Sequence, residues 1–121
     1  MATMKENLEQ ILKEARGENV ESSAIITRDG LTITSDVSAG LDEEILAAMM
    51  ATIYRAAEIA ASRLKKSTAK RIITEFNDER AIITSIEPKA LLVTIVKSKG
   101  DYELACKKID TTAEKIEKVF S

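Results

Sequence analysis

Histidine is missing from this sequence, and cysteine, glycine, proline and the aromatic residues are scarce. Without histidine the chain cannot form a His-based catalytic triad, a His-containing zinc site or an imidazole base that titrates near neutral pH. The single cysteine, Cys106, cannot form an intramolecular disulfide, so we expect a protein of the reducing cytoplasm. These absences exclude much of the common catalytic and metal-binding chemistry.

The four glycines each lie at a boundary between predicted elements, and none belongs to a P-loop or a dinucleotide-binding loop. Three consecutive acids at 42–44 could ligate a hard cation, but such a run at a helix start more often caps the helix. No nucleophile stands in a pattern with a base. We therefore expect a non-enzyme with no catalytic residue, no cofactor and no metal site.

Neither sign of charge predominates, because 18 Lys and Arg residues and 20 Asp and Glu residues give a net charge of −2. This balance gives no electrostatic reason to bind nucleic acid or an anionic membrane. The basic stretch from Lys65 to Arg71 offers a nucleic-acid alternative, which conflicts with the net charge and the few aromatics. No apolar run approaches the roughly 20 residues that span a bilayer, so we expect no membrane insertion.

What the chain does have is 45% apolar and 31% charged residues over 121 positions, which suits one domain spanning 1–121. Apolar periodicity and capping residues predict helices at 3–16, 42–66 and 101–120. β-prone runs predict strands at 20–27, 31–35, 71–76, 81–86 and 90–96. Because the strand connections are short, neighbours should be antiparallel. We predict an α+β fold of order α-β-β-α-β-β-β-α, with a five-stranded antiparallel sheet and helices on both faces.

Local signals support this order. Thr3 and Glu6 form the Ser/Thr-x-x-Glu capping box at the start of the first helix. The Asp29-Gly30 step between two β-prone runs indicates a hairpin. The run 90–96 is almost continuously apolar, as expected of a central strand covered on both faces. The polar residues Asn77, Asp78, Glu79 and Arg80 are expected to form a turn.

The long helix carries more apolar surface than one sheet face can bury. Its apolar side chains span an arc of about 220°, whereas packing on one face needs roughly 100°. Alanine widens this arc without needing burial, but Ile45, Met50, Tyr54 and Ile59 remain on its flanks. The simplest second surface is the same helix in another copy of the chain. Two flanks could meet that copy: Met50, Tyr54 and Ala61, or Ile45, Ala56 and Ile59.

Three patterns follow one another along the chain. The first is 24–35, Ala-Ile-Ile-Thr-Arg-Asp-Gly-Leu-Thr-Ile-Thr-Ser; the second is 40–44, Gly-Leu-Asp-Glu-Glu, before an Ala- and Met-rich helix. The third is the strand 91–96, followed by a polar loop and an amphipathic last helix. In this order they resemble the roadblock/dynein light chain family over 19–120. The resemblance implies the profilin-like roadblock fold, with the long helix on one sheet face and the two terminal helices on the other.

The resemblance also implies a homodimer, in which the long helices pack antiparallel and the third strands pair into a continuous sheet. Family members are non-catalytic platforms; many bind small Ras-like GTPases and regulate their nucleotide cycle, and others are light chains that assemble larger complexes. We therefore expect a homodimer that binds and regulates a small GTPase. The alternative is a light-chain-type scaffold that does not sense the nucleotide.

These expectations assign two sets of residues. The dimer interface is expected to contain Ile45, Met49, Met50, Ile53, Tyr54, Ala57, Ala61, Ile72, Thr74 and Phe76. The outward side of the long helix is expected to bind the partner through Ala47, Ala51, Arg55, Glu58 and Ser62.

Overall fold

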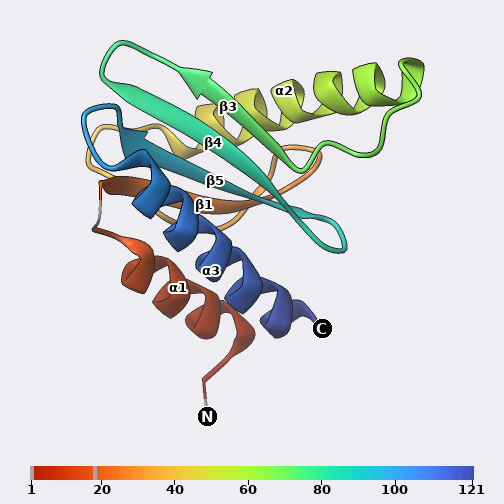
Figure 1. The fold of residues 1–121 in the computed structure, drawn as a ribbon. Coiled ribbons are helices and arrows are strands. Elements are labelled where there is room, and N and C mark those ends of the chain that lie inside the picture. The colour runs from red at the N-terminus through yellow and green to blue at the C-terminus, as the bar shows by residue number, and fades with distance from the viewer. Residues whose placement is uncertain (1, 18) are drawn as a thin grey trace.

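The computed structural model describes residues 2–17 and 19–121, which form three layers (Figure 1). The elements are α1 (Met4–Ala15), β1 (Val20–Thr27), β2 (Thr32–Asp36), α2 (Glu43–Arg63), β3 (Arg71–Glu75), β4 (Glu79–Ile86), β5 (Ala90–Lys97) and α3 (Tyr102–Phe120). Helix α2 covers one face of the sheet, while α1 and α3 lie side by side on the other. The predicted element order and the division of the helices between the two faces are confirmed.

The five strands form one sheet in the order β2-β1-β5-β4-β3, and every neighbouring pair is antiparallel. Strand β5 lies at the centre, as its continuous apolar run predicts, and its residues are buried up to Val96. Strands β2 and β3 form the two edges.

Two apolar cores lie on opposite faces of this sheet because successive strand residues point in opposite directions. In β4, Ile82 packs with α1 and α3, whereas its neighbour Ile83 packs with α2. Leu12 of α1 and Ile109 of α3 are buried in the first core.

Side-chain caps fix where the helices begin. The Thr3 hydroxyl accepts a hydrogen bond from the backbone N–H of Glu6 at 3.1 Å, and the Glu6 carboxylate accepts one from the Thr3 N–H at 3.1 Å. Asp42 caps α2 by accepting from the Ile45 N–H at 3.1 Å, and Asp101 caps α3 in the same way. The acidic run at the start of α2 thus contains a cap, as expected.

The structure corrects three predicted boundaries. Glu79 and Arg80, expected in a turn, belong to β4, where Glu79 pairs with Lys97 across the ladder. This cross-strand partner is distant in sequence, so local composition could not reveal it. Phe76 lies just beyond β3. Helix α2 ends at Arg63 and not at residue 66, since Lys65 takes a left-handed backbone conformation with φ of 57°.

Candidate protein-interaction surface

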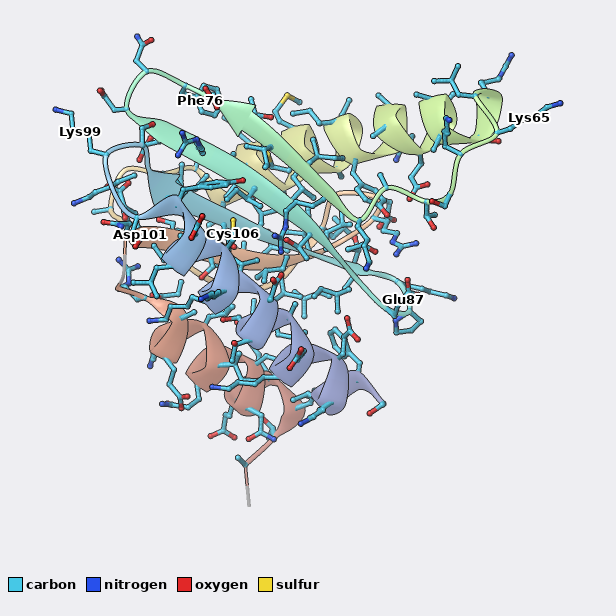
Figure 2. The ribbon with its side chains drawn as sticks, in the orientation of Figure 1. Lys65, Phe76, Glu87, Lys99, Asp101 and Cys106 are labelled. Atoms are coloured by element: carbon cyan, nitrogen blue, oxygen red, sulfur yellow. The ribbon has the colours of Figure 1, made fainter. Side chains whose placement is uncertain are left out.

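Helix α2 has a buried side and an exposed apolar side. Its buried side, facing the sheet, consists of Leu46, Ala47, Met50, Ala51 and Tyr54. On the opposite side Ile45, Met49 and Ile59 are 61%, 51% and 55% exposed. We call these three side chains the apolar ridge. The C-terminal part of α2 also runs beyond the strands, ending near Lys65 (Figure 2).

The prediction that Ala47 and Ala51 face outward is wrong, because they are only 1% and 2% exposed. The turn between β1 and β2 packs directly on this part of α2. A Cβ on Gly30 would lie 3.3 Å from the Ala48 Cα and 3.6 Å from the Ala51 Cβ. Small residues are required where the turn backbone approaches the helix so closely.

The other predicted partner-binding residues are differently placed. Arg55 and Ser62 are exposed, and Glu58 is half-buried. Their part in binding a partner stays a prediction.

Of the residues predicted at a dimer interface, Met50 and Tyr54 lie in the core of the chain itself. Burial against the sheet removes them from the surface that a second copy could contact. Ile53, Ala57 and Ala61 are half-buried, whereas Ile45 and Met49 are exposed. Between the two flanks left open by the sequence, the one with Ile45, Ala56 and Ile59 is the exposed one.

The sequence offered no way to choose between these flanks. Both carry apolar side chains, and alanine fits either environment. Ile59 was predicted on one of the two flanks but was left out of the predicted interface set, because choosing that flank required knowing which side of α2 meets the sheet.

Strand β3 provides a second feature of this surface. It pairs only with β4 among the described strands, so its outer edge is open for hydrogen bonding. Ile72 and Thr74 are half-buried, and Ile72 packs into the core under α2. Phe76, at the end of this strand, is 56% exposed (Figure 2).

A cavity of about 440 Å³ lies beside Phe76, between the loop that enters α2 and the sheet. Its apolar lining includes Leu41, Leu46, Met50 and Ile95. A mainly apolar hollow with few polar groups suits an apolar side chain.

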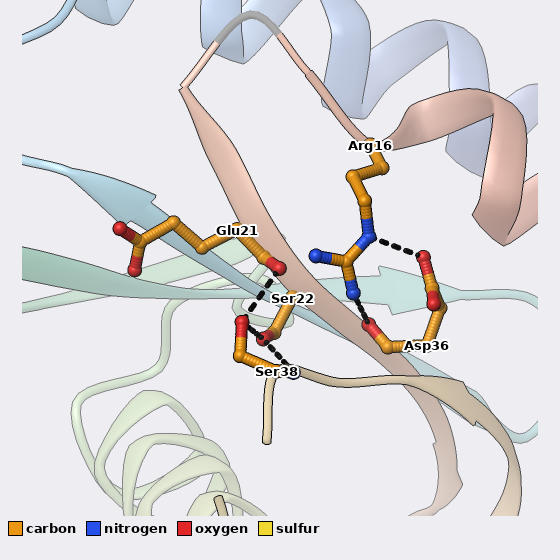
Figure 3. A network of polar contacts seen from close by, with 5 residues as sticks. All are labelled: Arg16, Glu21, Ser22, Asp36 and Ser38. Carbon is orange, nitrogen blue, oxygen red and sulfur yellow. Dashed lines mark hydrogen bonds and ion pairs between the residues drawn. The ribbon is translucent and has the colours of Figure 1, made fainter. Parts of the chain in front are cut away.

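A polar network fixes the loop that forms one wall of this cavity (Figure 3). The Ser38 N–H donates to Ser22 Oγ at 2.8 Å, and the Ser38 hydroxyl donates to the Glu21 carbonyl at 3.1 Å. The Arg16 guanidinium binds Asp36 at the end of β2 with an Nε–Oδ2 distance of 2.9 Å. These contacts hold the chain as it leaves β2 and so position the start of α2.

Two titratable side chains on this side of the molecule, Glu79 and Tyr54, have raised pKa values. A hydrogen bond with Glu21 raises the pKa of Glu79 at the rim of the cavity, and partial burial raises it further. Burial raises the pKa of Tyr54, and its hydroxyl donates to the Ala69 carbonyl at 3.2 Å. Tyr54 thus anchors the segment after α2, which is a structural role.

By length and composition alone, α2 is apolar enough to cross a membrane, so the expectation that no apolar run approaches that length is wrong. A helix that covers the core of a soluble protein meets the same criteria. Here Leu46, Met50 and Tyr54 pack on the sheet, and inserting α2 into a bilayer would uncover that core. Absence of membrane insertion stays a prediction.

Within residues 2–17 and 19–121, no three His, Cys, Asp or Glu side chains are grouped to hold a metal ion.

Known proteins with the same architecture are similar to this chain. Residues 6–96 match the Roadblock/LC7 domain family. The protein MJ1340 of Methanocaldococcus jannaschii is 25% identical over 110 residues, which are 91% of this chain and 96% of that protein. MglB of Myxococcus xanthus superposes with a TM-score of 0.91 at 16% identity, covering 99% of this chain and 92% of MglB. A Roadblock/LC7 domain from Streptomyces avermitilis gives 0.80 at 14% identity, covering 94% of each chain. The predicted profilin-like fold is confirmed.

Proposed function

This chain belongs to the Roadblock/LC7 domain family, and from this premise we propose that it is a cytoplasmic, non-catalytic homodimer that binds and regulates a small Ras-like GTPase. The observation that carries the proposal is the apolar ridge on α2, a helix whose other side already packs on the sheet.

The ridge supports a homodimer on physical grounds. Ile45, Met49 and Ile59 are large apolar side chains on one helix side, and an exposed apolar patch of this kind indicates a protein contact. Ala56, between these side chains, and the neighbouring Ala60 are also exposed and leave room for a second helix to approach closely. The open edge of β3 offers backbone hydrogen bonds to the same second copy. A twofold pairing satisfies both features at once.

Family membership supports the GTPase partner, because many members of this family bind small Ras-like GTPases. The catalytic groups would belong to the GTPase, and this chain would contribute a docking surface. By linkage, the dimer can shift the GTPase between its nucleotide states only through a difference in affinity for the two states. Arg55 and Ser62, which are exposed on α2, are the predicted contacts.

The test is capture from the source lysate by the immobilised chain, in parallel with a non-hydrolysable GTP analogue and with GDP. We expect a small GTPase to be captured in one nucleotide state only. Arg55→Glu should weaken this capture, whereas Lys13→Glu on the distant helix α1 should not. Equal capture of large proteins in both states would overturn the regulator and favour the scaffold alternative.

A further inference from the structure

Three cationic side chains from separate segments line one cavity at the end of the sheet. The cavity lies where the β1–β2 and β4–β5 turns approach α2, and its volume is about 540 Å³. It is lined by Thr27, Arg28, Asp29, Arg55 and Lys89. We call it the basic cavity. Three of its lining residues are cationic and one is a carboxylate, whereas the whole chain carries a net charge of −2.

The Arg28 guanidinium is held in place before any ligand arrives. One of its nitrogens, Nη2, donates to the Ser85 hydroxyl at 3.0 Å, and its Cζ lies 5.5 Å from the centre of the Tyr54 ring. Its Nε is buried and makes no hydrogen bond within the described part of the chain. Tyr54 is itself fixed in the core, so the position of Arg28 is set by the fold.

The three cations are not neutralised by ion pairs. Among the residues that the structure describes, the five ion pairs within 4.0 Å involve neither Arg28, Arg55 nor Lys89. The one acid of the cavity, Asp29, is engaged in its own turn, where it accepts a hydrogen bond from the Thr27 hydroxyl. That bond lowers the pKa of Asp29, and the charge of Arg55 lowers it a little further.

We propose that the basic cavity binds a phosphate monoester group. Such a group carries a charge of about −1.5 to −2 at pH 7 and offers three strong acceptor oxygens. Arginine guanidinium groups bind two such oxygens in a fork, and a lysine adds a point charge. Two arginines and a lysine on separate walls therefore suit this dianion better than a carboxylate with a single charge. The proposal requires neither the dimer nor the GTPase, and both can fail without affecting it.

The test is a titration of the isotope-labelled chain, followed by NMR, with phenyl phosphate and with benzoate at equal ionic strength. The two probes share a ring and differ in the charge and number of their oxygens. We expect saturable shifts of the amide signals of Asp29, Gly30 and Lys89 with phenyl phosphate and much weaker ones with benzoate. Equal responses to both probes, or no response beyond that to sodium chloride, would overturn the proposal.

Matched variants locate the site. Arg55→Gln should weaken phenyl phosphate binding about tenfold, because one charge-assisted contact is lost. Arg63→Gln removes the same charge from an exposed position on the same helix that does not line the cavity. It should leave the affinity unchanged. Equal loss in both variants would reduce the effect to overall charge and reject the site.

Two further probes distinguish the sources of the phosphate group. Inorganic phosphate represents a free ligand, and a short Gly- and Ser-flanked phosphoserine peptide represents a modified protein. Tighter binding of the peptide would assign the cavity to a phosphorylated protein. Comparable binding would assign it to a free phosphate compound.

Discussion

The two faces of the sheet are covered in different ways. On one face, α1 and α3 pack side by side and bury large apolar side chains such as Leu12 and Ile109, while Met4 and Leu104 stay exposed near their N-terminal ends. On the other face α2 lies alone and has apolar side chains on both its buried and its exposed sides. The first face is completed within one chain, whereas the second leaves an apolar helix side uncovered. Both faces therefore bury a core, and the face covered by α2 is the one that leaves an exposed apolar helix side.

The largest expected effect is on the free energy of unfolding, from a substitution in the core beneath α1 and α3. Leu12→Ala removes a fully buried side chain from the core beneath α1 and α3. We expect the free energy of unfolding to fall by about 2–5 kcal/mol, as measured by denaturant unfolding. Lys13→Ala, at an exposed neighbouring position, should change it by less than about 0.5 kcal/mol. A loss of less than about 1 kcal/mol would contradict the close packing of Leu12 in this core.

The next effect is on association through the exposed face. Ile59→Lys places a charge on the apolar ridge, so we expect the dimer dissociation constant to rise at least about tenfold, or about 1.4 kcal/mol. Light scattering over a concentration series measures the shift, and circular dichroism should show an unchanged fold. Glu44→Lys is a control on the same helix. A wild-type chain that is monomeric at micromolar concentration would overturn the proposed dimer.

A smaller effect tests how closely the β1–β2 turn packs on α2. Gly30→Ala forces a side chain into φ of +96° and 3.3 Å from the Ala48 Cα, so we expect a loss of about 1–2 kcal/mol in thermal or denaturant unfolding. Gly40 has a similar φ of +89°, but a Cβ there meets nothing within 4 Å. Gly40→Ala therefore carries the backbone strain alone, and equal losses in both variants would remove the packing contribution.

The smallest effect concerns Glu21 and Glu79, two acids near the cavity beside Phe76. Because Glu21 and burial raise the pKa of Glu79 above its ordinary value of 4.5, the folded state holds that proton more tightly than the unfolded chain. Stability should therefore fall as the pH rises from about 4.5 through the raised pKa. Glu79→Gln or Glu21→Gln should reduce this loss of stability over the pH range, by less than about 1 kcal/mol. Unfolding curves between pH 4 and 8 measure it, and an unchanged slope in both variants would contradict the pairing.

Much of the fold was predictable because its signals are local. The Thr3–Glu6 capping box, the Asp29-Gly30 hairpin and the apolar run of β5 lie within short segments, and the structure confirms them. The start of β4 was mispredicted because the charged residues Glu79 and Arg80 pair with β5, which follows later in the chain. The candidate surface was only partly predictable. The excess of apolar residues on the long helix was visible, but the side that meets the sheet was not.

The order of the elements and the helix caps follow from residues within a few positions of one another, and so could be predicted. The rotation of α2 about its axis depends on tertiary contacts. An alanine-rich helix has no strong preference for one buried side, so the approach of the Gly30 turn and the packing of Tyr54 decided it. The same folding brought Arg28, Arg55 and Lys89 from three distant segments to one cavity.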